Sequence, residues 1–143
     1  MTPALLYRIA SVLLVLYAAG HTIGFQRIDP RWGIDNFING LRTTPVVVQG
    51  AKRTYWGFIL GFGYFCTVLM LFSALLAWEL GGLPPATLAA LPVITWGLAV
   101  SFLVATLVTV RFFFAAPIAF STLVTICLTL AAWMSGAGHL VTQ

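Results

Sequence analysis

The sequence predicts an all-α fold, a four-helix transmembrane bundle that forms a single domain over residues 1–143. Composition is the first reason: 61% of the residues are apolar and 7% are charged, against roughly 25% charged residues in an ordinary soluble domain. The mean hydropathy of +1.03 agrees with this. The second reason is that four stretches are long enough for a helix to cross the roughly 30 Å hydrocarbon core of a bilayer, which takes about 20 apolar residues.

The first two helices are bounded by residues with known capping preferences. We expect the first helix at about residues 4–25, opened by Pro3. The second is expected at about residues 55–78, with Thr54 as its N-cap and Gly81-Gly82 after its end.

Prolines open the third and fourth helices. Inside a helix a proline clashes with the carbonyl group four residues back, whereas the first helical position accepts it. We therefore expect a third helix at about residues 92–113, opened by Pro92, and a fourth at about residues 117–138, opened by Pro117.

The connection over residues 26–54 is too long for a simple loop. Asp29 and Pro30 suit an N-cap and a first helical position, which predicts a short amphipathic helix at about residues 30–42 on the membrane surface. An ordinary structured loop is the alternative, because Gly33 and Gly40 weaken a helix. The apolar face of such a helix would consist of Trp32, Phe37, Ile38 and Leu41.

The basic residues predict the orientation of the chain in the membrane. If all four helices cross, one side holds six of the seven Lys and Arg residues, and Arg8 is on the other side. Basic residues near helix ends are retained in the cytoplasm, so both termini are expected outside and the 26–54 loop inside. No basic run exceeds Lys52-Arg53, and no nucleic-acid partner is expected. The six are Arg27, Arg31, Arg42, Lys52, Arg53 and Arg111.

This topology brings four chemically distinctive residues, His21, Arg53, Tyr55 and Arg111, to one layer at the inner leaflet. Arginine binds phosphate or carboxylate through two hydrogen bonds, and basic pockets between helices hold anionic lipid headgroups. We therefore predict that these four residues bind a lipid or another amphipathic anion. The alternative is that His21 is a neutral ring hydrogen-bonded to a neighbouring helix or to Thr22, while the arginines only reach to the interface as topology anchors.

The two histidines argue against a haem cofactor. His139 is expected at the outer end of the fourth helix, about 30 Å from His21 if the helices span the core. One iron therefore cannot take both imidazoles, a haem held by one histidine has no support, and no cofactor is expected.

Acidic residues and cysteines exclude further classes. Asp29, Asp35 and Glu79 all lie outside the apolar interiors, whereas ion-coupled transporters place carboxylates near the midplane. Cys66 and Cys127 stand alone in separate apolar stretches, which is typical of buried structural cysteines. Neither a metal site nor a thiol redox pair is expected.

Two pairs of glycines have the spacing of helix-packing motifs in membranes. Gly20 and Gly24 are four residues apart, as are Gly57 and Gly61. Small residues at this spacing let helix backbones approach closely. The partner helix could belong to the same chain or to a second copy, so a homo-oligomer through either face is a prediction of this pattern.

Three stretches, GHTIGF at 20–25, GAKRTYWGFILGFGYF at 50–65 and RFFFAAPIAFS at 111–121, occur in this order. Together they resemble an uncharacterised family of small bacterial four-helix membrane proteins, and the resemblance covers most of the chain. It implies a four-helix fold and a bacterial inner membrane, and it brings no established activity. The family's motif positions fall on His21, Gly24, Arg53, Tyr55, Trp56, Gly61, Gly63, Arg111 and Pro117.

Three functions fit these observations. The leading one is an integral membrane protein that binds membrane lipid or an amphipathic anion at the inner leaflet. The second is a membrane-embedded enzyme acting on a lipophilic substrate, with His21 as acid or base and Arg53 and Arg111 holding an anionic group. The third is an accessory subunit of a larger membrane complex.

Overall fold

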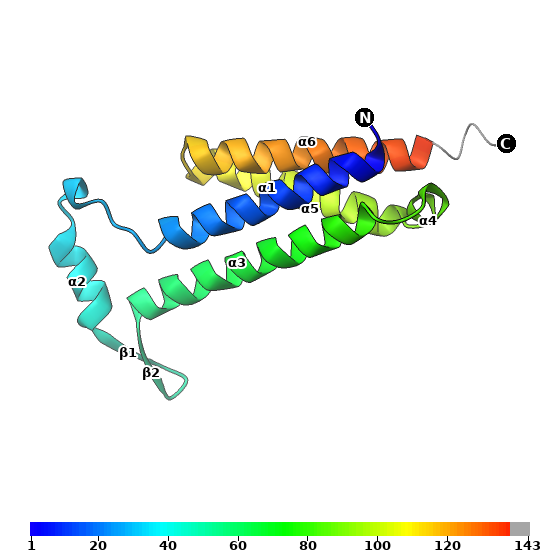
Figure 1. Ribbon diagram of the computed structural model, residues 1–143. Coiled ribbons are helices and arrows are strands. Elements are labelled where there is room, and N and C mark those ends of the chain that lie inside the picture. The colour runs from blue at the N-terminus through cyan, green and yellow to red at the C-terminus, as the bar shows by residue number, and fades with distance from the viewer. Residues whose placement is uncertain (138–143) are drawn as a thin grey trace. The chain divides into compact units, whose positions relative to one another are not determined.

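Four long apolar helices dominate residues 1–137, the part of the chain that the computed structural model describes (Figure 1). Each of the four is long and apolar enough to cross a membrane. The predicted all-α, four-helix class is confirmed, and the chain has the construction of a multi-pass membrane protein. His139 and the end of the predicted fourth helix lie outside the described residues. The four helices are α1 (Pro3–Gly24), α3 (Tyr55–Leu80), α5 (Pro92–Phe112) and α6 (Ala115–Ala137).

Prolines stand at or near the start of three of these helices. Pro3 and Pro92 occupy the first positions of α1 and α5, as predicted. The prediction that Pro117 opens the fourth helix is wrong, because α6 begins two residues earlier at Ala115. The first four N–H groups of a helix have no intrahelical acceptor, so a proline at the third position removes no hydrogen bond.

The ends of α3 follow the predicted capping. The Oγ1 of Thr54 accepts a hydrogen bond of 3.1 Å from the Gly57 amide, which satisfies one of the first N–H groups. The helix ends at Leu80, immediately before Gly81-Gly82. The connection that follows contains a short helix that was not predicted, α4 (Pro85–Ala89), with Pro85 in its first turn.

The segment after α1 contains two helical pieces in place of one helix over residues 30–42. A 3₁₀ helix, η1 (Pro30–Trp32), is capped by the Asp29 side chain, and α2 (Asp35–Thr43) follows. Gly33 separates them with φ +65°, a left-handed conformation that ends a helix and that glycine adopts without strain.

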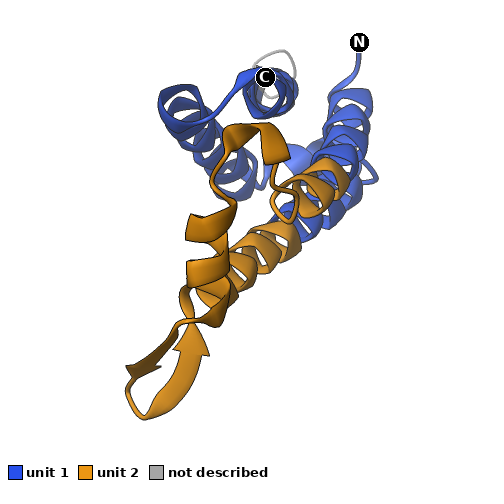
Figure 2. Cartoon of the chain, turned by 90° about the vertical axis from the view of Figure 1, so that its left-hand side faces the viewer, with its two compact units in different colours: residues 1–17, 70–143 blue, residues 18–69 orange. Residues whose placement is uncertain are grey.

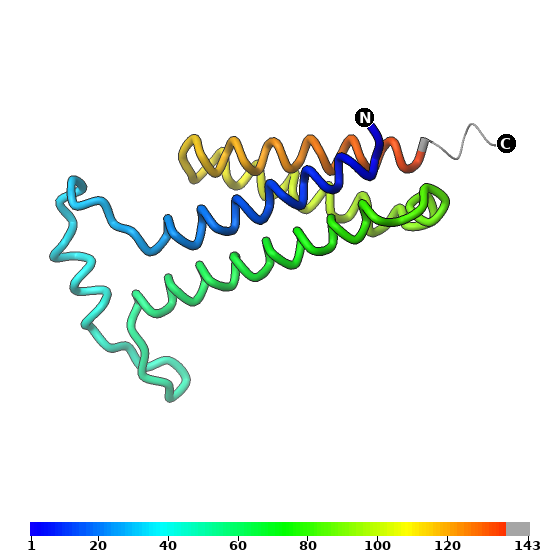
Figure 3. The backbone as a smooth tube through the Cα atoms, in the orientation of Figure 1, coloured from blue at the N-terminus to red at the C-terminus, as the bar shows by residue number. Residues whose placement is uncertain are grey.

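A β-hairpin that was not predicted joins α2 to α3; Figure 3 traces its backbone. Strands β1 (Pro45–Val48) and β2 (Ala51–Thr54) pair antiparallel, with Pro45 opposite Thr54. The two turn residues, Gln49 and Gly50, both have positive φ, +49° and +82°. Positive φ at both positions is typical of the type I′ turn, which matches the twist of paired strands.

The chain divides into two compact units, coloured separately in Figure 2. One contains residues 1–17 and 70–143 and the other residues 18–69. The core of the first unit places Tyr7, the largest fully buried side chain of the described residues, among leucines and alanines of α1, α3, α5 and α6. Small residues let helices pack closely in lipid. Hydrogen bonds between helices add to this packing, and Ser11 Oγ donates to the Ala74 carbonyl oxygen at 2.7 Å.

The Asp29 cap gives a prediction about pH. The Arg31 guanidinium, with help from the Arg31 backbone amide, holds the pKa of Asp29 below its ordinary value. A lowered pKa means that the contact stabilises the folded segment above the unfolded pKa of about 3.9 and is lost as the pH falls through the lower folded value. In an NMR titration the chemical shift of the Arg31 backbone amide should therefore change with pH, with a midpoint below about pH 3.9. The shift should vanish in Asp29→Asn and persist in the control Asp35→Asn. A midpoint at or above the ordinary value would contradict the cap.

Candidate functional site

His21 lies in the last turn of α1 and contacts α3. Its Nε2 is 3.1 Å from the carbonyl oxygen of Gly63. A carbonyl oxygen can only accept, so the ring nitrogen carries the proton and donates it. The side chain is half-buried. This geometry corresponds to the alternative stated for His21, a ring hydrogen-bonded to a neighbouring helix.

Phe25 fills the space beside this hydrogen bond. Its ring centroid is 5.0 Å from that of His21 and 5.3 Å from that of Tyr64, which it meets edge to face. A Cβ atom on Gly63 would lie 2.5 Å from Phe25 Cε2, closer than any real contact. The absence of a side chain at Gly63 therefore makes room for the Phe25 ring.

Two threonines complete a polar layer between the helices. Thr22 Oγ1 donates to the Ala18 carbonyl oxygen at 2.7 Å and lies 2.9 Å from Thr67 Oγ1. Thr67 Oγ1 is also 3.1 Å from the Gly63 carbonyl oxygen. Each hydroxyl group has one proton, so two protons serve these three contacts. We call His21, Thr22, Gly63 and Thr67 the His21 layer; it joins the end of α1 to α3.

Tyr55, the first residue of α3, and Arg53, in β2, lie at a different level from His21. His21 is level with Gly63, eight residues after Tyr55, which is about 12 Å along a helix. Tyr55 is exposed and packs edge to face on Phe58 at 6.2 Å. Arg53, in β2, donates from Nη1 to the Lys52 carbonyl oxygen at 2.8 Å. The expectation that His21, Arg53 and Tyr55 share one depth is therefore not met.

Arg111, the fourth predicted site residue, belongs to the first unit. It lies exposed in the last turn of α5, with its guanidinium carbon 5.2 Å from the ring centroid of Phe112. Its contact is thus with its own neighbour in the sequence.

Exposed cations gather in the segment between α1 and α3. The guanidinium of Arg42 lies 4.6 Å from the ring centroid of Trp56, a cation–π contact that joins the end of α2 to the start of α3. Within residues 1–137 the one ion pair is Arg31 with Asp29, and no group of three metal-binding side chains occurs. The exposed cations of this segment are Arg27, Arg31, Arg42, Lys52 and Arg53.

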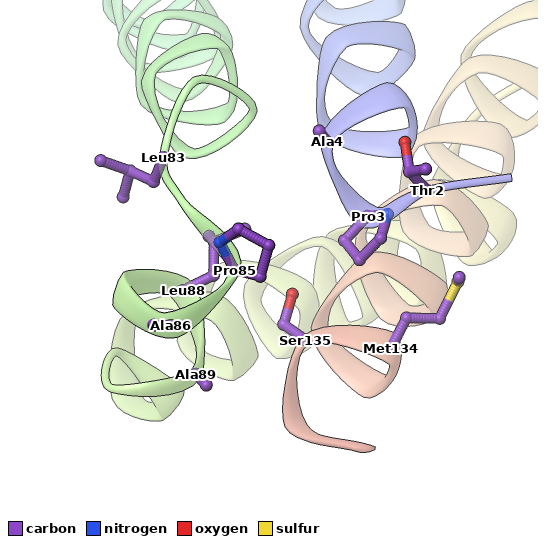
Figure 4. A pocket seen from close by; sticks show the side chains of 10 residues that line it. All are labelled: Thr2, Pro3, Ala4, Leu83, Pro85, Ala86, Leu88, Ala89, Met134 and Ser135. Atoms are coloured by element: carbon purple, nitrogen blue, oxygen red, sulfur yellow. The ribbon is translucent and has the colours of Figure 1, made fainter. Parts of the chain in front are cut away.

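The first unit holds two features that sequence reasoning missed. The guanidinium carbon of Arg8 lies 3.7 Å from the ring centroid of Trp78, and its side chain packs against Gly81. A cavity of about 620 Å³ opens between the start of α1, the segment of α4 and the end of α6 (Figure 4). No sequence motif marks either feature, because both depend on how distant helices are aligned.

The fold and these sites define a small multi-pass membrane protein with an extramembrane segment between its first two spans. Comparisons with models of protein families, with curated proteins and with solved structures gave no match.

Proposed function

We propose that the protein binds anionic lipid at the cytoplasmic leaflet of a bacterial inner membrane, with both termini outside. The observation that carries this proposal is the segment over residues 26–54, where exposed cations and exposed large apolar side chains occur together. Anionic headgroups attract each nearby Lys or Arg by about 1 kcal/mol, while apolar side chains enter the headgroup boundary. The excess of basic residues on this side and the resemblance to bacterial four-helix membrane proteins support the membrane and the orientation.

The apolar partners in this segment are large and accessible. Trp32, Phe37 and Val47 are 63%, 64% and 72% exposed. Exposed aromatic and branched side chains on a segment outside the spans would be costly in water, whereas they are stabilised in the lipid interface. Lys52 stands opposite Val47 on the hairpin, and Arg42 lies in the last turn of α2. Both supply the charge that anionic lipid requires.

In this proposal Arg53, Tyr55 and Arg111 each contact anionic headgroups, and His21 is a positioning residue that holds α1 to α3. The enzyme alternative has less support, because the cavity described above is not lined by His21. The Nε2 proton of His21 goes to the Gly63 carbonyl oxygen, so only Nδ1 could act as a base. The third function, an accessory subunit of a larger membrane complex, is compatible with the same exposed surface over residues 26–54. In that case a partner protein should co-purify with the chain.

The lipid retained through purification tests the proposal. In Arg53→Ala plus Arg111→Ala, two cations are removed, and bound anionic phospholipid should fall by up to about 30-fold. Quantitative mass spectrometry measures its ratio to zwitterionic phospholipid. The matched control, Arg53→Lys plus Arg111→Lys, keeps both charges and should retain most of the lipid. A periplasmic reporter fused after Gln143 must stay active in all proteins. An unchanged ratio in the alanine variant would remove the proposal.

The glycine pairs Gly20/Gly24 and Gly57/Gly61 are relevant to whether the protein forms a homo-oligomer. A Cβ atom at Gly20, Gly24 or Gly61 would meet nothing within 4 Å in the described chain, and one at Gly57 would meet only Thr54 of its own turn. Close packing within the chain therefore does not account for these glycines. We propose that one of these faces meets a second copy, which the mass of the solubilised protein, corrected for detergent, would test.

A further inference from the structure

The cavity in the first unit is built from three separate parts of the chain. Its walls come from residues 2–4, from five residues of the segment that contains α4 and from the pair Met134-Ser135. The five are Leu83, Pro85, Ala86, Leu88 and Ala89. In Figure 4 the Ser135 side chain lies between Pro3 and Pro85, with its hydroxyl group directed into the space between them. The volume of about 620 Å³ is within the range of ligand pockets, roughly 300–1,000 Å³.

The chemistry of the walls favours an uncharged ligand. Among the described lining residues none is charged, and hydroxyl groups occur only on Thr2 and Ser135. Ser135 Oγ donates to the Ala131 carbonyl oxygen at 2.7 Å, which leaves its lone pairs available. Arg8, on the next turn of α1, is held over Trp78. An uncharged, mostly apolar molecule therefore suits the cavity.

Tyr7 supplies an independent sign of a ligand. It is fully buried, and its hydroxyl group comes close to other hydroxyl groups without reaching hydrogen-bond geometry to any of them. The group lies near the hydroxyl groups of Ser135 and Thr95, of which Ser135 lines the cavity. A buried donor without an acceptor is unfavourable, and native proteins rarely keep one without a reason. A ligand acceptor that takes the Ser135 proton would turn this hydroxyl group away from Ala131. In the turned position Ser135 Oγ could also accept from Tyr7, so that both hydroxyl groups are used.

The position of the cavity indicates where such a ligand comes from. It lies where α1 begins and where α6 approaches its end at Ala137, so it is at the ends of two apolar spans. The end of a membrane span lies at the boundary where the acyl chains of lipids are joined to their headgroups. Burying an apolar chain brings little gain to a molecule already in lipid, so hydrogen bonds would decide which lipid is retained.

We propose that this cavity binds a neutral lipid, with its acyl chain against the α4 wall and an ester carbonyl oxygen accepting from Ser135, which in turn accepts from Tyr7. This site is separate from the anionic-lipid contacts proposed above. It differs from them in taking an uncharged headgroup.

Photolabelling of the full-length protein in nanodiscs tests the site. The probe is a monoacylglycerol with a diazirine in its chain, and the comparison probe is the fatty acid with the same chain. Labelling by the monoacylglycerol probe at residues 83–89 and 134–135 should saturate, and unlabelled monoacylglycerol should reduce it. The extent of labelling should be severalfold higher than with the fatty-acid probe. Unsaturable labelling, or equal labelling by the fatty acid, would overturn the proposal.

Variants separate the cavity from general lipid contact. Ala86→Trp fills the cavity and should reduce labelling at least tenfold, whereas Ala90→Trp, on an exposed residue outside the lining, should not. Tyr7→Phe keeps the buried ring and should reduce labelling severalfold while leaving the unlabelled protein as stable as before. Full labelling of either Ala86→Trp or Tyr7→Phe would show that this site is not the one occupied.

Discussion

Replacing Tyr7 with alanine is expected to lower the free energy of unfolding by about 3 kcal/mol, at the lower end of the range for large aromatic side chains. Tyr7 is 0% exposed and is the largest fully buried side chain of the described residues. The loss comes from the cavity and from lost van der Waals contacts with the helices around it. The transfer contribution is small, because helices separated in a bilayer are already in an apolar solvent.

The matched control is Tyr7→Phe, which removes only the hydroxyl group. Because that group has no hydrogen-bond partner, its removal should change the free energy of unfolding by less than about 1 kcal/mol and can even stabilise the protein. Reversible unfolding in mixed micelles measures both variants. A loss in Tyr7→Phe as large as in Tyr7→Ala would mean that the hydroxyl group is bonded in the folded protein.

The four helices could be predicted because their signals are local. Apolar length decides that a span exists, and Pro3, Pro92 and Thr54 act within one turn of where they stand. The hairpin was missed because its turn, Gln49-Gly50, lacks the Asn or Asp that usually precedes the glycine of a type I′ turn. Gly33 was recognised as a weakness in a helix, but its left-handed φ could not be known in advance.

The candidate site was predictable only in part. The sequence places His21 near one end of α1, but its level on α3 depends on how two helices slide past each other, which a sequence pattern does not give. The contact with Gly63 makes His21 about two turns deeper than Tyr55. Arg8 illustrates the same limit, because its partner Trp78 lies 70 residues away in the sequence. Residues that meet across helices are therefore identified by packing.

Gly63→Ala is expected to destabilise the end of α1 against α3 by about 1–2 kcal/mol. The added Cβ would lie 2.5–2.7 Å from three atoms of the Phe25 ring, so the ring must leave its place. Overpacking costs about 1–3 kcal/mol, and the higher helix propensity of alanine returns up to about 1 kcal/mol. Since Phe25 also contacts the His21 ring, its displacement should speed the exchange of the His21 Nε2 proton with water.

Gly61→Ala is the matched control, because it lies on the same helix two residues earlier with nothing within 4 Å of its Cβ position. Only the propensity gain applies there, so this variant should be neutral or more stable by up to about 1 kcal/mol. Equal free energies of unfolding for the two alanine variants would contradict the role given to Gly63.

A double-mutant cycle then identifies the Phe25 ring as the cause. In a Phe25→Ala background the ring is absent, so adding Gly63→Ala should cost nothing, which corresponds to a coupling of about 1–3 kcal/mol between the two positions. His21 proton exchange should already be fast in Phe25→Ala and unchanged by the second substitution. If the cost of Gly63→Ala persists without the ring, the backbone approach of α1 to α3, and not Phe25, requires glycine. The His21 layer would then be held by backbone packing alone.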